Sequence, residues 1–108
     1  MAAGISKNPL AWKYLGEFNS KTEISITNID FSELYLYPYA GTYGASILVR
    51  KDSLESIIKR FVCGGSLSTS NVFGFSFQIT TAYIKLTSAY SGGAGDTSDT
   101  AKFKVYYR

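Results

Sequence analysis

The sequence predicts an all-β fold: a single-domain antiparallel β-sandwich, jelly-roll-like, with about eight short strands and at most one helical turn. Three stretches place large apolar or aromatic residues at every second position, as a strand with one buried face does. These residues are Phe73, Phe75, Phe77 and Ile79, then Tyr35, Tyr37 and Tyr39, and finally Phe103, Val105 and Tyr107. Turn-forming residues separate such short runs along the chain, which is typical of sandwiches and barrels.

Eight runs of this kind are expected to form strands. In chain order they cover residues 12–18, 23–27, 33–39, 45–50, 57–63, 71–81, 83–90 and 102–107. The first run predicts one shared face for its even-numbered residues, from Trp12 to Phe18. Residues 1–10 precede the strands as a flexible lead-in or attachment segment, so the sandwich domain is expected to span residues 11–108.

The third expected strand, residues 33–39, carries three tyrosines on one face. Its other face carries Leu34, Leu36 and Pro38. Because proline has no N–H group for a ladder hydrogen bond, Pro38 predicts that this strand ends there or lies at a sheet edge.

The segment after residue 50 is ambiguous between helix and strand. Asp52 and Glu55 fit a helix-capping pair, and apolar residues fall at helical spacing up to Phe61. Residues 57–63, however, are rich in strand formers and stop at two glycines. We expect one helical turn over residues 53–56, then a strand, and a polar loop over residues 66–70.

Composition argues against most catalytic and metal-binding functions. The 108 residues include no histidine and a single cysteine, Cys63. This excludes the usual general base, a histidine or multi-thiolate metal site and an intramolecular disulfide. The carboxylates lie in expected turns or at polar strand positions rather than as a catalytic pair. We expect no enzyme activity, no cofactor and no bound metal, and interpret Cys63 as a small buried hydrophobic residue.

Charge and hydropathy also restrict the partners. The formal net charge is +3, from 11 basic and 8 acidic residues spread along the chain, which does not indicate a nucleic-acid partner. Residues 1–10 lack the apolar segment of a signal peptide, and no run approaches the ~20 apolar residues of a membrane helix. We therefore expect synthesis in the cytoplasm and no membrane insertion.

The glycine-rich segment 91–100 invites two ligand hypotheses. As a phosphate cradle it lacks the lysine and the following helix, and as a calcium loop it offers Asp96 and Asp99 at the wrong spacing. We interpret the segment as a hairpin tip, where Asp96 and Asp99 remain candidates for contact with a ligand or another subunit.

The tyrosines carry the main functional question. Tyr35, Tyr37 and Tyr39 share one face, Tyr43 follows shortly after, and Tyr90 is a further contact candidate. Tyrosine is apolar on its ring faces and polar at its tip, so such a stripe can stack on sugar rings. It can also lie between identical subunits or pack inside the sandwich. The sequence leaves these three uses open.

Four short motifs resemble a known family. They are WKYLG at residues 12–16, ISI at 24–26, FSELY at 31–35 and KVYYR at 104–108. This pattern is similar to small β-domains at the C-terminal ends of phage and prophage tail-fibre or receptor-binding proteins of Gram-positive bacteria. The resemblance implies a structural component of the virion, a trimeric β-sandwich head that joins other virion proteins and contacts a saccharide or protein on the host surface. It brings no catalytic residues.

Two functional hypotheses follow. The first is a virion attachment domain that forms a homo-oligomer, with a trimer favoured, and adheres through multivalent contacts. The second is a free-standing carbohydrate-binding module that uses the tyrosine face as its platform.

Overall fold

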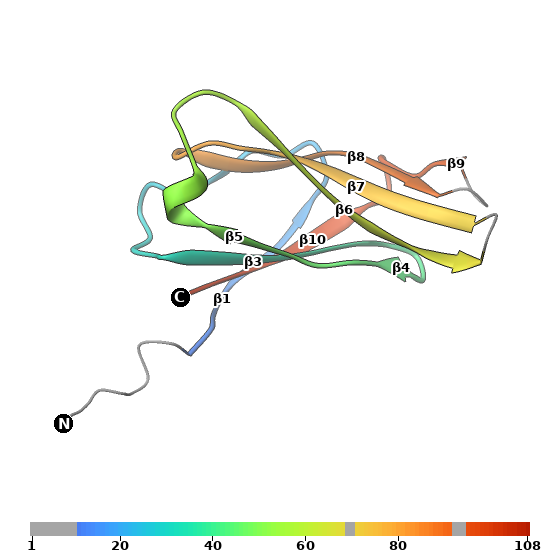
Figure 1. The fold of residues 1–108 in the computed structure, drawn as a ribbon, viewed down its shortest axis with the longest axis horizontal. Helices are drawn as coiled ribbons and strands as arrows, with labels where there is room; N and C mark the ends of the chain where they lie inside the picture. The colour runs from blue at the N-terminus through green and yellow to red at the C-terminus, as the bar shows by residue number, and fades with distance from the viewer. Residues whose placement is uncertain (1–10, 69–70, 92–94) are drawn as a thin grey trace.

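The computed structural model describes residues 11–68, 71–91 and 95–108, which form two antiparallel sheets packed face to face (Figure 1). The tyrosine sheet has the order β1-β10-β3-β4, and β5 also pairs with β3. Its strands are β1 (Lys13–Asn19), β10 (Lys102–Tyr107), β3 (Glu33–Ala40), β4 (Tyr43–Gly44) and β5 (Ile47–Arg50). The expected N-terminal segment 1–10 lies outside the described residues.

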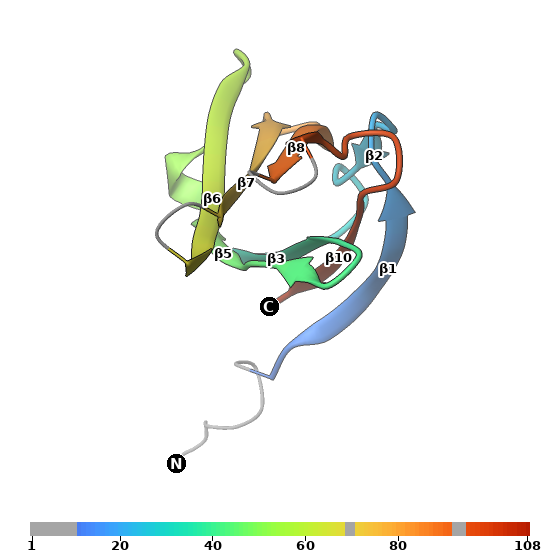
Figure 2. The ribbon, with the colours of Figure 1, turned by 90° about the vertical axis from the view of Figure 1, so that its right-hand side faces the viewer.

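The phenylalanine sheet has the order β2-β8-β7-β6, and β9 also pairs with β8. Its strands are β2 (Ile24–Ser25), β8 (Tyr83–Ser91), β7 (Asn71–Ile79), β6 (Lys59–Ser68) and β9 (Gly95–Asp96). Viewed end-on, the two sheets lie as two layers, and the chain passes from β1 to β2 along one side (Figure 2). The expected all-β sandwich is therefore confirmed.

The connectivity is jelly-roll-like because early strands lie against late ones: β1 pairs with β10, and β2 with β8. Strands β6, β7 and β8 follow one another as antiparallel neighbours. The eight expected strands are all present. The last has the expected ends, and the other seven are shifted at one or both ends. The described residues add two strands of two residues each, β4 and β9.

The core lies between the sheets and follows the two-residue period. Phe75 and Phe77 of β7 are buried, as predicted, and Phe77 meets Phe103 of β10 edge to face with ring centroids 5.4 Å apart. Phe73 is only partly buried and packs between Phe75 and Tyr43 near the end of the sandwich. Apolar burial of this kind is the main stabilising contribution to a sandwich.

The predicted shared face of β1 is wrong, because a β-bulge interrupts the alternation. The register with β10 shifts between Tyr14 and Gly16, so Leu15 is the extra residue. Gly16 has φ +152°, and a Cβ there would lie 2.9 Å from the ring of Phe18. The bulge leaves Tyr14 on the outer face and brings Phe18 against the core.

The prediction from Pro38 is also wrong. Strand β3 continues to Ala40 and lies inside the sheet, between β10 and the pair β4 and β5. The carbonyl oxygen of Pro38 accepts a hydrogen bond from the N–H of Ala45, in the gap between β4 and β5. In an antiparallel ladder the N and O of one residue point to the same side. The nitrogen of Pro38 therefore faces this gap, where the absent N–H costs no regular ladder bond.

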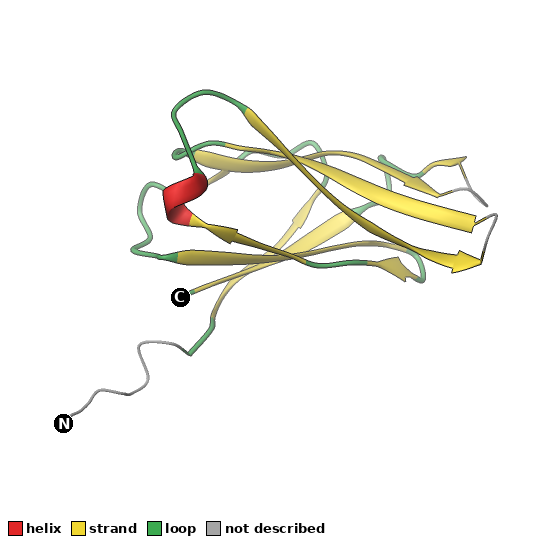
Figure 3. Ribbon diagram, in the orientation of Figure 1, coloured by secondary structure: helices red, strands yellow, loops and turns green. Residues whose placement is uncertain are grey.

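The helical turn and two loops differ from expectation. The turn is a 3-10 helix at Lys51–Ser53, earlier than the expected residues 53–56, and strand β6 begins at Lys59 (Figure 3). Strand β6 runs to Ser68, so most of the expected loop 66–70 is strand, and residues 69–70 lie outside the described part. The expected loop 91–100 contains β9. Across the described residues, no helix is long and apolar enough to cross a membrane.

Candidate functional site

The tyrosine sheet carries an aromatic face on its outer side. Leu34, Leu36 and Pro38 point into the core, so the tyrosines between them on β3 point outward. The prediction that Tyr35, Tyr37 and Tyr39 share a face is confirmed, and packing inside the sandwich is excluded for them. We define the aromatic face by its six side chains: Trp12, Tyr14, Tyr35, Tyr37, Tyr39 and Tyr106.

A hollow of about 380 Å³ lies in the aromatic face, lined by Trp12, Tyr35, Tyr37, Tyr106 and Lys104. Cross-strand pairing brings these residues together, since Tyr35 lies opposite Tyr106 and Tyr37 lies opposite Lys104. The ring centroids of Trp12 and Tyr35 are 5.7 Å apart, and those of Tyr35 and Tyr106 are 6.2 Å apart. The volume falls within the range of small-ligand sites, roughly 300–1,000 Å³.

Trp12 is held in place by the other end of the chain. The guanidinium of Arg108 lies over the indole ring, and its Nε donates to Glu33 Oε1 at 2.8 Å. The backbone N–H of Arg108 also donates to the carbonyl of Glu33 at 3.1 Å. Since Arg108 is anchored to β3 in this way, it fixes one wall of the hollow.

Tyr37 and Tyr39 form the other end of the aromatic face, stacked with ring centroids 6.2 Å apart and an interplanar angle of 28°. The hydroxyl of Tyr37 lies over Gly44, where a Cβ would come within 2.7 Å of it. The hydroxyl of Tyr39 donates a hydrogen bond to Glu17 Oε2 on β1. That bond, followed by burial, raises the pKa of Tyr39 above its usual value. Both rings are thus oriented by neighbouring strands.

The other two predicted tyrosines lie elsewhere. Tyr43 packs inward against Phe73, with ring centroids 5.5 Å apart, so it belongs to the edge of the core. It turns inward because it lies on β4, opposite Ala40, whose side chain is buried. Tyr90 is 54% exposed on the outer face of the phenylalanine sheet, opposite Asp96 of β9. Neither tyrosine contributes to the hollow.

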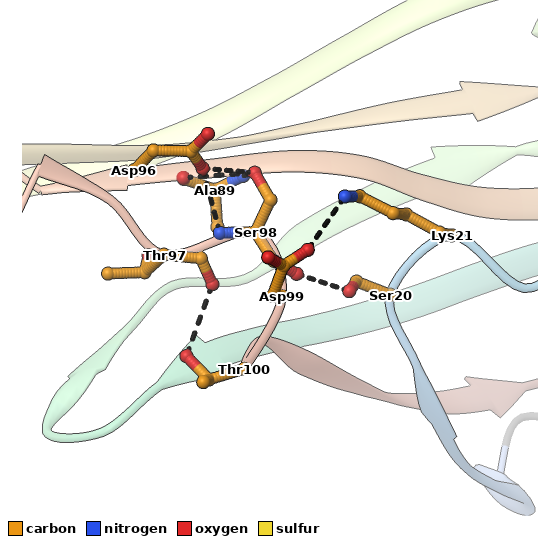
Figure 4. Close-up of polar contacts among 8 residues, drawn as sticks. All are labelled: Ser20, Lys21, Ala89, Asp96, Thr97, Ser98, Asp99 and Thr100. Carbon is orange, nitrogen blue, oxygen red and sulfur yellow. Dashed lines mark hydrogen bonds and ion pairs between the residues drawn. The ribbon is translucent and has the colours of Figure 1, made fainter.

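Asp96 and Asp99 stabilise the chain between β8 and β10 (Figure 4). Asp96 Oδ1 accepts hydrogen bonds from the backbone N–H of Ser98 at 2.9 Å and from the Ser98 hydroxyl, and these bonds lower the pKa of Asp96. Asp99 Oδ1 accepts a bond from Lys21 Nζ at 2.8 Å, and the Ser20 hydroxyl donates to the carbonyl of Ser98. Both carboxylates therefore have partners within the fold, although the Lys21–Asp99 pair is exposed to solvent, and the hollow lies on the other sheet.

The sequence pattern missed part of the hollow. Trp12, Tyr106 and Lys104 were not predicted as contact residues, although the alternation in residues 102–107 already places Lys104 and Tyr106 on the face opposite Phe103. Trp12 carries no comparable local signal, because its position depends on β1 pairing with β10. Among the described residues, no group of three or more cysteine, aspartate or glutamate side chains is placed to hold a metal ion.

Comparisons with known proteins identify no relative: no family, curated protein or solved structure matches this chain.

Proposed function

We propose that this chain is a non-catalytic saccharide-binding domain that attaches a phage virion to its host, with the aromatic face as the contact surface. The observation that carries the proposal is the hollow, which has aromatic side chains on most of its boundary. A sugar ring has apolar C–H faces and a rim of hydroxyls. Tyrosine and tryptophan match both features, because they combine an apolar ring with a polar tip.

The exposure of the walls supports a preformed binding surface. Trp12 is 37% exposed and lies under the Arg108 guanidinium, and Tyr37 is 39% exposed and stacks with Tyr39. Rings held in this way lose little conformational entropy when a ligand stacks on them. A shallow site of this size gives weak affinity for one sugar, and a trimer would convert several weak contacts into firm attachment. The virion location rests on the resemblance of the four sequence motifs.

Glycan-array binding, with fluorescently labelled protein, tests the saccharide part. Tyr37→Ala should weaken binding about tenfold or more, equivalent to ~1.4 kcal/mol. Tyr90→Ala is the matched control, since it removes an exposed tyrosine from the opposite sheet, and it should bind as the wild type does. A wild-type protein that binds no glycan refutes saccharide recognition.

A free-standing carbohydrate-binding module is the alternative that the same hollow supports. Light scattering with mass determination separates the two. A trimer at about ten micromolar fits the attachment head, whereas a monomer that still binds glycans favours the module.

A further inference from the structure

Lys104 is the cation of the hollow. It lies on β10, between its cross-strand neighbours Tyr37 on β3 and Glu17 on β1. Its side chain is half-buried and lines the hollow together with four aromatic residues. A charge in such a mostly apolar concavity is less screened by water than a charge on an open surface.

Lys104 has no ion-pair partner within the part of the chain that the structure describes. The ion pairs there join other groups: Lys21 with Asp99, Arg50 with Asp52, Lys59 with Glu55, and Arg108 with Glu33. The nearest carboxylate along the ladder, Glu17, accepts the hydroxyl of Tyr39 instead. The ammonium of Lys104 is therefore available to an anionic group from outside.

The surrounding face adds to the positive charge. Lys102, two residues before Lys104 on β10, points to the same outer side and is exposed. Arg108, further along, is compensated by Glu33. Among the described residues, the cross-strand partners of Lys102 and Lys104 on β1 and β3 include one carboxylate, Glu17, so the outer face of β10 has an excess of positive charge.

We infer that the hollow binds an acidic saccharide, whose ring stacks on the aromatic walls while an anionic oxygen accepts a hydrogen bond from Lys104 Nζ. This inference rests on the proposed saccharide binding and adds the charge of the ligand. The oxygen can belong to the carboxylate of a uronic acid or to a sugar phosphate, because an ammonium group binds either as a point charge.

The experiment compares matched polysaccharides immobilised on a sensor surface. The probes are uronic-acid polysaccharides and their carboxyl-reduced forms, and phosphate-containing bacterial polysaccharides and their dephosphorylated forms. The wild type should bind at least one acidic probe about threefold to tenfold more tightly than its neutral form, with the preference shrinking as salt rises. The pair that shows the preference identifies carboxylate or phosphate as the anion.

Three variants test the role of Lys104. Lys104→Met keeps the apolar stem and removes the charge, so it should weaken binding of the acidic form about threefold to tenfold more than binding of the neutral form, which removes the preference. Lys104→Arg should retain the preference, and Lys102→Met is the matched control outside the lining of the hollow. Thermal melts verify that each variant folds.

The binding results separate a failure of the acidic-saccharide inference from a failure of saccharide binding itself. Equal wild-type binding to acidic and neutral forms overturns the inference and leaves the proposed function standing. If Lys104→Met weakens binding of the acidic and the neutral form equally, Lys104 contributes to the wall of the hollow and not through its charge. That result also overturns the inference. A wild type that binds no probe in either form overturns the saccharide-binding proposal itself.

Discussion

The guanidinium carbon of Arg108 lies 4.2 Å from the centroid of the Trp12 indole ring. This contact joins the residue that precedes β1 to the residue that follows β10, and it positions the only tryptophan of the chain at the rim of the hollow. A cation over an indole face contributes about 0.5–1 kcal/mol at an exposed site. The spectroscopic signal of Trp12 therefore reports directly on this wall.

Arg108→Gln should loosen Trp12. Because the variant removes both the cation over the ring and the ion pair to Glu33, acrylamide quenching of the Trp12 fluorescence should increase, and glycan affinity should fall about threefold. Arg60→Gln on the phenylalanine sheet is the control and should alter neither quantity. Unchanged quenching in Arg108→Gln would show that Trp12 is held by other contacts.

Gly44→Ala should misplace Tyr37 without unfolding the sheet. Gly44 has no positive φ, so alanine fits the backbone, but its Cβ would lie 2.7 Å from the Tyr37 hydroxyl. The exposed ring must move, and glycan affinity should fall about threefold or more while the free energy of unfolding changes by less than about 1 kcal/mol. Titration calorimetry and urea unfolding measure the two effects.

Gly74→Ala is the matched control for that prediction. It adds the same methyl group to a strand of the opposite sheet, where the nearest atom is 3.7 Å away. It should leave glycan affinity unchanged. If both glycine variants weaken binding equally, the contact between Gly44 and Tyr37 does not orient the ring.

The carboxylate of Asp96 should make stability sensitive to acid. The bonds from Ser98 lower the pKa of Asp96 below 3.8, its ordinary value. The stabilisation is therefore present above about pH 3.8 and is lost as the pH falls through the lower pKa of the folded state. Asp96→Asn should lower the melting temperature at neutral pH, and the difference from wild type should shrink below pH 3.8. Glu23→Gln, an exposed substitution before β2, is the control. A difference in melting temperature between Asp96→Asn and wild type that stays constant with pH would contradict a stabilising role of the ionised Asp96.

Cys63 should react slowly with alkylating reagents. Cys63 is only partly buried, against the core, rather than fully buried as expected. This partial burial still raises the pKa of its thiol from 9.0 to about 11, which reduces the thiolate at pH 8 by about a hundredfold. Mass spectrometry after iodoacetamide treatment should show little labelling of the native protein and full labelling in urea. Labelling of the native chain as fast as that of free glutathione would refute the buried-thiol interpretation.

The two faces of the central strands could be predicted from the sequence because the two-residue period is local. Leu34 and Leu36 are apolar and alternate with tyrosines, so only one orientation of strand β3 buries the two leucines in the core. The same reasoning applies to Phe75 and Phe77 in β7. It fails at Leu15, where a bulge changes the alternation of β1, and at Tyr43, whose two-residue strand has no period to follow.

By itself, the sequence determined an all-β chain with a tyrosine-bearing face and no histidine chemistry. Only the tertiary structure decided that Trp12, Tyr106 and Lys104 join Tyr35 and Tyr37 around one hollow. The reason is that these residues are brought together by the pairing of β1, β10 and β3. Such pairings join distant parts of the chain, and they are selected by burial of the whole core rather than by any local pattern.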